Sequence, residues 1–126
     1  MVNFDPTRPI YLQIIEEVKK RAVRGDYAAG EQLPSVRDMA AQMGVNPNTM
    51  SRAYQELERE GFVHTKRGEG SFLTHENVRI ESERTGLAQA ACSQFVVQLR
   101  DLSLDTATTR HLLQRVEEKV NENGDR

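Results

Sequence analysis

The chain has 126 residues, and its 17 basic and 19 acidic side chains give a formal net charge of −2 at pH 7. This length suits one ordinary domain, or a small domain with an appended segment, and it excludes a large second domain. No apolar stretch is long enough to cross a bilayer and no signal peptide is recognisable, so we expect a cytoplasmic protein without membrane contact. The single cysteine, Cys92, has no Cys or His neighbour at metal-ligand spacing, and we expect a buried thiol on a helix face rather than a redox site.

The first expected helix runs from Pro9 to about Arg24. Thr7 is placed to cap it, and Pro9 suits its first position because a missing N–H costs nothing there. Its apolar residues recur at helical spacing and predict one buried face: Tyr11, Ile14, Ile15, Val18 and Ala22. For the basic run near its end we expect a solvated face, with phosphate contact as the alternative: Lys19, Lys20, Arg21 and Arg24.

Two helices joined by a turn of about three residues are expected within residues 34–61. Ser35 followed by Asp38 is a capping-box start for the first of them. Gly44 ends that helix, because glycine adopts the left-handed conformation past a helix end at little cost. Asn46 then caps the second helix.

The second of these helices has two distinct faces. One arc is apolar and predicts the core side: Met50, Ala53, Tyr54 and Leu57. The opposite side carries residue types that hydrogen-bond base edges and phosphates: Asn48, Ser51, Arg52, Gln55 and Arg59. This face suits a DNA groove, and the alternative is an ordinary solvated helix surface.

A short edge strand is expected at residues 31–33, and a β-hairpin at residues 62–74 with a basic, glycine-rich tip. Three helices followed by a hairpin is the order of a winged helix. In that arrangement Lys66 and Arg67 at the tip meet phosphate or enter the minor groove, and the glycines allow close approach of the backbone. An ordinary surface hairpin is the alternative.

The acidic net charge is an argument against a nucleic-acid binder. Local placement of charge matters more, and the proposed fold brings four cations to one side: Arg37, Arg52, Lys66 and Arg67. We therefore expect modest affinity for non-specific DNA.

In residues 76–126 the apolar residues recur at helical spacing and predict two helices, each with an apolar stripe. Two helices packed only against each other cannot bury both stripes. Gly86 inside the first of them is a possible kink. A partner subunit is the natural cover, and the residues expected to form the dimer interface are Leu87, Ala91, Phe95, Leu99, Leu102, Leu112, Leu113 and Val116. The expected fold class is α+β: an N-terminal winged helix-turn-helix domain in residues 1–75, followed by a short two-helix C-terminal dimerisation segment in residues 76–126.

Four sequence motifs together resemble the GntR family of bacterial transcription regulators, over roughly residues 9–74. They are Pro9-Ile10-Tyr11-Leu12-Gln13, the run from Gly30 to Arg37, Val45-Asn46-Pro47-Asn48-Thr49 with Arg52-Ala53-Tyr54, and Gly68-Glu69-Gly70-Ser71-Phe72. The short remainder after them resembles the YtrA subfamily. The resemblance implies a sequence-specific DNA-binding transcription regulator, usually a repressor, that binds a palindromic operator as a homodimer.

The resemblance also implies which residues contact operator DNA. By position, Ser35 and Arg37 meet phosphate. The residues in or beside the major groove are Asn46, Asn48, Thr49, Ser51 and Arg52, and the wing contact is formed by Lys66, Arg67 and Gly68. Many relatives carry an arginine where Pro47 stands, so base recognition rests more on Asn48 and Arg52 in this chain.

Other functions find little support in the sequence. A winged helix that binds only protein is the alternative, because the acidic segment 56–60 could face a protein instead of DNA. We expect no enzyme, metal site or cofactor, since His64, His75 and His111 lie on different elements without a partner at recognisable spacing. The operator sequence, the regulated genes and any small-molecule effector are not encoded in a recognisable motif.

Overall fold

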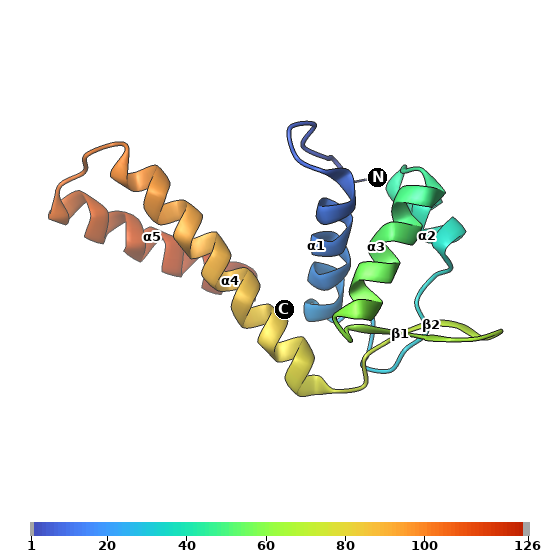
Figure 1. The fold of residues 1–126 in the computed structure, drawn as a ribbon. Helices are drawn as coiled ribbons and strands as arrows, with labels where there is room; N and C mark the ends of the chain where they lie inside the picture. The colour runs from blue at the N-terminus through green and yellow to red at the C-terminus, as the bar shows by residue number, and fades with distance from the viewer. Residues whose placement is uncertain (1, 125–126) are drawn as a thin grey trace. The chain divides into compact units, whose positions relative to one another are not determined.

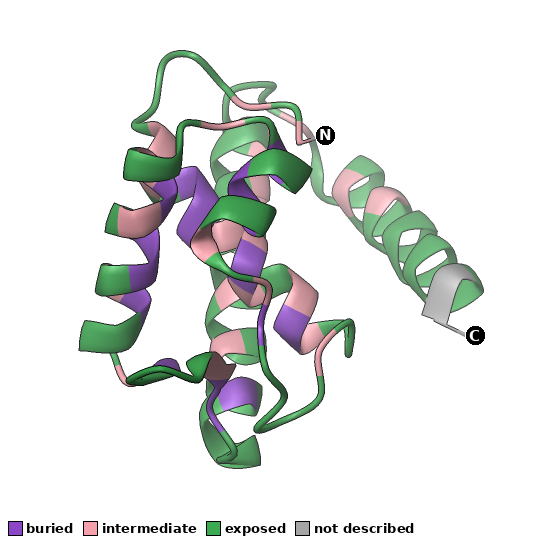
Figure 2. Ribbon diagram, turned by 90° about the vertical axis from the view of Figure 1, so that its right-hand side faces the viewer, coloured by how far each residue is buried: buried purple, intermediate pink, exposed green. Residues whose placement is uncertain are grey.

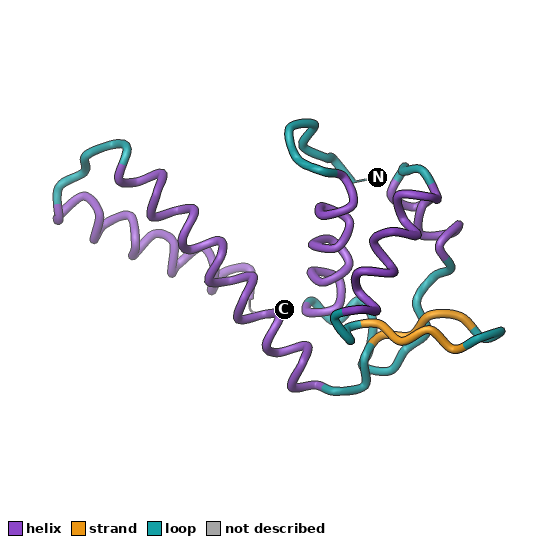
Figure 3. The backbone as a smooth tube through the Cα atoms, in the orientation of Figure 1, coloured by secondary structure: helices purple, strands orange, loops and turns teal. Residues whose placement is uncertain are grey.

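A computed structural model describes residues 2–124. The chain divides into two compact units, Met1–Leu87 and Ala88–Arg126. The first unit contains α1 (Ile10–Val23), α2 (Val36–Met43), α3 (Pro47–Arg59), β1 (Val63–Lys66) and β2 (Gly70–Leu73). Helix α4 (Asn77–Arg100) begins in the first unit and ends in the second, which also contains α5 (Thr106–Gly124) (Figures 1 and 3).

The core of the first unit lies where α1 and α2 pack against α3. Ile14, Met39, Met50 and Leu57 have no exposed surface, and Phe62 carries the same core toward the hairpin. Figure 2 shows the buried residues on the inward faces of these helices. The apolar faces predicted from helical spacing are therefore the faces that fold inward.

The start of α1 differs from the prediction, because Thr7 does not cap it. The Thr7 hydroxyl instead donates to the carboxylate of Asp5. The buried side chain of Gln13 holds the lead-in segment: its Nε2 donates to the carbonyl oxygens of Asp5 and Arg8, and its Oε1 accepts from the Asp5 N–H at 2.8 Å. A glutamine one turn inside the helix thus anchors the lead-in segment, and α1 begins without a side-chain cap.

The turn between α2 and α3 is formed as predicted. The Ser35 Oγ accepts from the Asp38 N–H at 3.1 Å and caps α2. Gly44 ends this helix with φ of 73°, in the left-handed region. The Asn46 Oδ1 accepts from the Asn48 N–H at 2.7 Å and caps α3, whose first residue is Pro47.

The wing consists of β1 and β2, which pair antiparallel from Val63 opposite Leu73 to Lys66 opposite Gly70. The expected third strand at residues 31–33 is reduced to a single bridge between Gln32 and Phe72. Two backbone hydrogen bonds flank that bridge, and they are enough to hold the segment against β2. Three helices followed by a hairpin confirm the winged-helix class.

The second unit contains the end of α4 and all of α5. Helix α4 continues through Gly86 without a break, and α5 begins after Asp105, whose Oδ1 accepts from the Thr108 N–H at 2.7 Å. Ile80 is the one buried residue of α4, and α5 has no buried residue among those whose burial the structure describes. Cys92 is exposed, which corrects the expectation of a buried thiol. Within residues 2–124, every helix is too short or too polar to span a membrane.

Candidate nucleic-acid interface

The cationic side chains of the first unit fall into two groups. Most form an ion pair with a neighbouring carboxylate. Among residues 2–87, those without one are Lys20, Arg37, Arg52, Lys66 and Arg67. All but Lys20 belong to the set predicted to contact DNA. The ion pairs therefore neutralise the other cations of this unit and leave these five without an ion-pair partner among the described residues, even though the net charge of the chain is negative.

The start of α2 is held in place by a tyrosine on α3. The Tyr54 hydroxyl donates to the Pro34 carbonyl oxygen at 2.6 Å, and Tyr54 as a whole is 5% exposed. Burial raises the pKa of Tyr54 well above its usual range, with a smaller contribution from Tyr27, so the hydroxyl remains a donor. This bond fixes the residue immediately before Ser35. Ser35 and Arg37 are both exposed. The capping role of Ser35 uses an acceptor of its hydroxyl and leaves the O–H free to donate to phosphate.

The start of α3 presents the polar residues that the sequence predicted. Asn46, Asn48 and Arg52 are exposed, whereas Thr49 and Ser51 are half-buried. Asn46 caps the helix with its side-chain oxygen, so its amide N–H₂ group remains available as a donor. The guanidinium carbon of Arg52 lies 3.7 Å from the centroid of the Tyr11 ring. The first two turns of α3 thus gather amide and guanidinium donors.

Arg59, at the far end of the same helix, differs from these residues. Its Nη2 donates to the Glu56 carboxylate at 2.7 Å, an ion pair within one helix turn. The polar face predicted along the whole of α3 is therefore cationic only near its amino end. The segment with the acidic residues Glu56, Glu58 and Glu60 forms the other end.

The wing tip is braced by residues outside the hairpin. The Gln32 Nε2 donates to the Glu69 carbonyl oxygen at 2.7 Å. Gly70 has φ of 119°, and a Cβ there would lie 2.6 Å from the Gln32 Nε2, so this position accepts only glycine without a shift of that side chain. The Lys66 ammonium lies 4.7 Å from the centroid of the Phe72 ring. Lys66, Arg67 and Gly68 are all exposed.

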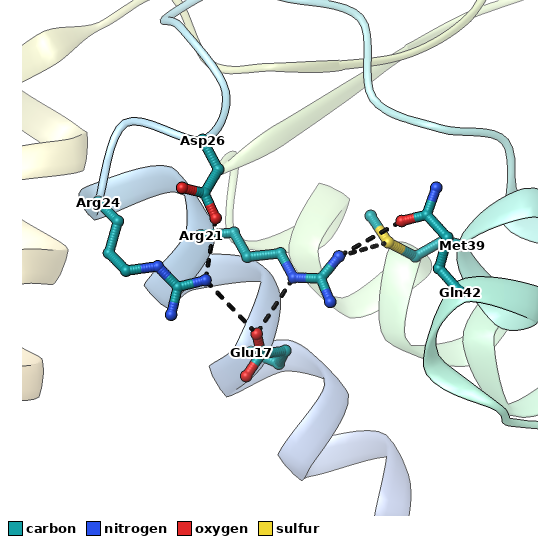
Figure 4. A network of polar contacts seen from close by, with 6 residues as sticks. All are labelled: Glu17, Arg21, Arg24, Asp26, Met39 and Gln42. Atoms are coloured by element: carbon teal, nitrogen blue, oxygen red, sulfur yellow. Dashed lines mark hydrogen bonds and ion pairs between the residues drawn. The ribbon is translucent and has the colours of Figure 1, made fainter. Parts of the chain in front are cut away.

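These parts belong to one compact unit. Figure 1 shows the hairpin extending from the carboxyl end of α3 toward the side of the unit on which α2 lies. A second contact joins α1 to α2. Arg21 donates to the Glu17 carboxylate at 3.1 Å and also contacts Met39 and Gln42 of α2 (Figure 4). Arg21 is thus a half-buried brace between helices, and the expectation of a solvated basic face is wrong at this residue.

Sequence reasoning also missed a polar cluster at the carboxyl end of α3. The Lys19 ammonium lies 2.9 Å from a Glu60 oxygen and 3.2 Å from a Glu83 oxygen. Burial acts to lower the pKa of Lys19, but its hydrogen bonds and charge attraction to these two carboxylates outweigh burial and raise that pKa. The Arg79 Nη1 donates to the Glu60 carbonyl oxygen at 2.8 Å. The first turns of α4 are therefore bound to α1 and α3. The residues in contact are about 20 to 60 positions apart in the sequence, so no local pattern predicts these contacts.

The second unit offers an apolar surface. Leu102, Leu113 and Val116 are 64%, 52% and 41% exposed. Ala91 is also exposed, and the other residues expected at a dimer interface are half-buried: Leu87, Phe95, Leu99 and Leu112. A hollow of about 470 Å³ within this unit is lined mainly by apolar side chains of α4 and α5, including Phe95, Leu99 and Leu113. Apolar side chains of both α4 and α5 therefore remain exposed in the single chain.

The histidine, cysteine and acidic side chains are the ones that could bind a metal ion. Within residues 2–124, no group of three or more His, Cys, Asp or Glu side chains is placed to hold a metal ion. His64 and His75 do approach each other, with ring centroids 6.4 Å apart, but they lie on β1 and after β2 without a third ligand.

Comparison with known proteins points to one class of function. Residues 10–73 match the family model described as bacterial regulatory proteins, gntR family. The chain is 42% identical over 102 residues to the uncharacterized HTH-type transcriptional regulator YhcF of Bacillus subtilis, covering 81% of this chain and 84% of that protein. It is 36% identical over 124 residues to the HTH-type transcriptional repressor YtrA of the same species, covering 97% of this chain and 91% of that protein. A solved structure of a GntR family transcriptional regulator from Listeria monocytogenes has a TM-score of 0.80 and 35% identity, covering 89% of this chain and 98% of that one.

Proposed function

The chain belongs to the gntR family of bacterial regulatory proteins and is a DNA-binding transcription regulator, and from this premise we propose that it is a cytoplasmic repressor that binds a palindromic operator as a homodimer. The observation that carries the proposal is the set of unpaired cations. Arg37, Arg52, Lys66 and Arg67 lie on α2, on α3 and at the wing, and none of them forms an ion pair with a carboxylate of the described residues. The similarity to a protein named as a transcriptional repressor extends over nearly the whole chain, and it supports repression rather than activation.

In the proposed complex α3 enters the major groove by its amino end. Asn48 and Arg52 contact base edges, because amide and guanidinium groups pair with adenine and guanine respectively. Asn46, Thr49 and Ser51 lie beside them. Ser35 and Arg37 bind phosphate at the start of α2, where the backbone N–H groups and helix dipole also favour an anion. Lys66, Arg67 and Gly68 form the wing contact.

The homodimer is proposed from the second unit. Its two helices expose leucine and valine side chains that water solvates poorly, and a second copy of the same surface would cover them. In the functional division that we propose, residues 1–75 bind DNA and residues 76–126 pair the subunits. Two copies related by a two-fold axis would then recognise half-sites about 34 to 36 Å apart on one DNA face. A protein-interaction module without DNA binding is not favoured, since the family consists of DNA-binding regulators.

DNA selection is the direct test of the function. The protein would be used to select binding sites from a random DNA pool, and affinity for the enriched site and for scrambled DNA would follow from fluorescence anisotropy at about 150 mM salt. We expect an inverted repeat to be enriched. Arg52→Ala should lose most of the preference for that site. Lys20→Ala removes an unpaired cation elsewhere and should retain it. Enrichment of no sequence, or equal losses in both variants, would refute specific recognition by α3.

The dimer requires a test of its own. Leu113→Glu places a charge on the apolar surface of α5 and should convert the protein to a monomer by light scattering at micromolar concentration. Gln114→Glu is the control: it adds the same charge at the next residue, which is exposed and polar, and should leave the dimer intact. We expect the monomer to bind the operator much more weakly, because neither half-site then benefits from a linked partner. A monomeric wild-type protein would contradict the proposal.

A further inference from the structure

A tyrosine on α1 lies directly beneath the arginine that the proposed function assigns to base recognition. The guanidinium carbon of Arg52 is 3.7 Å from the centroid of the Tyr11 ring, well inside the range of a cation–π interaction. Tyr11 is half-buried and packs against the core beside Ile10. Its ring is therefore a fixed surface, supplied by a helix other than α3.

The stack suits an arginine that must still form hydrogen bonds. A guanidinium on an aromatic ring uses its flat face and keeps its N–H donors at the edge, in its own plane. Recognition of guanine uses that edge, with two parallel bonds to O6 and N7. A carboxylate partner would occupy the same donors, and among the described residues Arg52 has none. The ring thus holds the side chain without occupying the donors that DNA needs.

The stack also lowers the cost of binding. A free arginine on a helix surface samples many rotamers and loses this freedom when it contacts DNA, at about 0.5–1.5 kcal/mol for an immobilised side chain. An arginine already held on a ring has lost part of that freedom before DNA arrives. Asn48 lies one helical turn before Arg52 on the same face, so a held Arg52 also keeps a constant offset from the second base contact.

We propose that Tyr11 is a positioning residue that presents Arg52 to a base edge, so that α1 contributes to operator specificity, an inference that rests on the function proposed above. Tyr11 acts through Arg52 and contributes no phosphate contact of its own. Its loss should reduce the preference for operator over scrambled DNA, while the electrostatic affinity for any DNA stays unchanged.

The test uses full-length protein and the DNA site selected as described above. Tyr11→Leu keeps an apolar side chain against the core but removes the ring, whereas Tyr11→Phe keeps the ring and removes only the hydroxyl. We expect Tyr11→Leu to reduce the ratio of operator to scrambled affinity by roughly 2- to 10-fold, the fold-change that corresponds to immobilising one such side chain. Tyr11→Phe should remain near wild type. In an Arg52→Ala background, Tyr11→Leu should have no further effect.

Each alternative gives a different pattern. Equal ratios for wild type and Tyr11→Leu would overturn the proposal, as would a rise in operator affinity, which would mean that the ring holds Arg52 away from DNA. A loss that persists in the Arg52→Ala background would assign Tyr11 a purely structural role. A loss that Tyr11→Phe shares would assign the effect to the hydroxyl, as a DNA contact of Tyr11 itself, and would overturn the positioning role of the ring. If Arg52→Ala itself binds the operator like wild type, recognition by Arg52 is wrong and this role of Tyr11 is wrong with it. A loss in Arg52→Ala alone would refute only the role of Tyr11.

Discussion

Removal of a single hydroxyl from α3 should weaken the whole first unit. In Tyr54→Phe the ring stays in the core, but the hydrogen bond of 2.6 Å to the Pro34 carbonyl oxygen is lost. A hydrogen bond of this kind contributes about 1 kcal/mol net, and a half-buried carbonyl left without its partner adds to the loss. We therefore expect the free energy of unfolding to fall by about 1–2 kcal/mol. For a unit of this size, such a change lowers Tm by roughly 5–15 °C.

The chain offers a selective probe for this measurement. It has no tryptophan, and its tyrosines are Tyr11, Tyr27 and Tyr54, all in the first unit, so tyrosine fluorescence in a urea titration follows that unit alone. Tyr11→Phe is the matched control, because among the described residues its hydroxyl makes no hydrogen bond. It should shift the urea midpoint little. Equal midpoints for Tyr54→Phe and Tyr11→Phe would refute the stabilising role of the bond.

The same variant links stability to function. Pro34 immediately precedes Ser35, so the lost bond loosens the start of α2, where phosphate contact is proposed. Measured well below the melting temperature, Tyr54→Phe should bind operator and scrambled DNA more weakly by a similar factor, since phosphate contacts carry no sequence information. A change confined to the operator would place the effect on base recognition instead.

Further predictions concern the wing, α4 and the start of α5. Gly70→Ala places a Cβ at a positive φ and against the Gln32 side chain, and it should lower the free energy of unfolding by about 2 kcal/mol. Gly86→Ala places a Cβ where nothing lies within 4 Å, and it should stabilise α4 by up to about 1 kcal/mol. Urea unfolding measures both changes. Arg79→Ala should raise amide hydrogen exchange at the start of α4, because its bond to the end of α3 is lost. Hydrogen bonds from Thr108 lower the pKa of Asp105 in the folded protein. The stability that this cap contributes is therefore present above about pH 4, the ordinary pKa of an aspartate, and is lost as pH falls through the lower pKa of the folded state. Thermal unfolding followed by circular dichroism should show this pH-dependent loss of stability in the wild type and not in Asp105→Asn.

The sequence predicted the elements whose causes are local. The caps at Ser35 and Asn46 lie within three residues of the N–H groups that they accept from, and Gly44 ends a helix by its own backbone preference. The two faces of α3 follow from its periodicity alone. For the same reason the order of helices and hairpin, and with it the winged-helix class, could be derived without a structure.

The errors and omissions have a different physical origin. The expected Thr7 cap does not form. Gln13 instead reaches back to hold the lead-in segment, a contact that no local pattern indicates. Lys19 lies on what the sequence predicts as a solvated face, yet folding brings the end of α3 and the start of α4 against it. The stack of Arg52 on Tyr11 likewise joins two helices. Such contacts depend on packing between elements, which helical periodicity does not specify.

The division of the cations into paired and unpaired groups also sets how the protein would respond to ionic strength. A homodimer would carry twice the four unpaired cations that the proposed interface contains. With about 0.9 condensed counterion released per phosphate neutralised, full engagement would give a slope of roughly −7 in log affinity against log salt. A twofold rise in salt would then weaken operator binding by about a hundredfold. Because the cations of the proposed interface are unpaired, a moderate rise in ionic strength would be enough to release the proposed dimer from its operator.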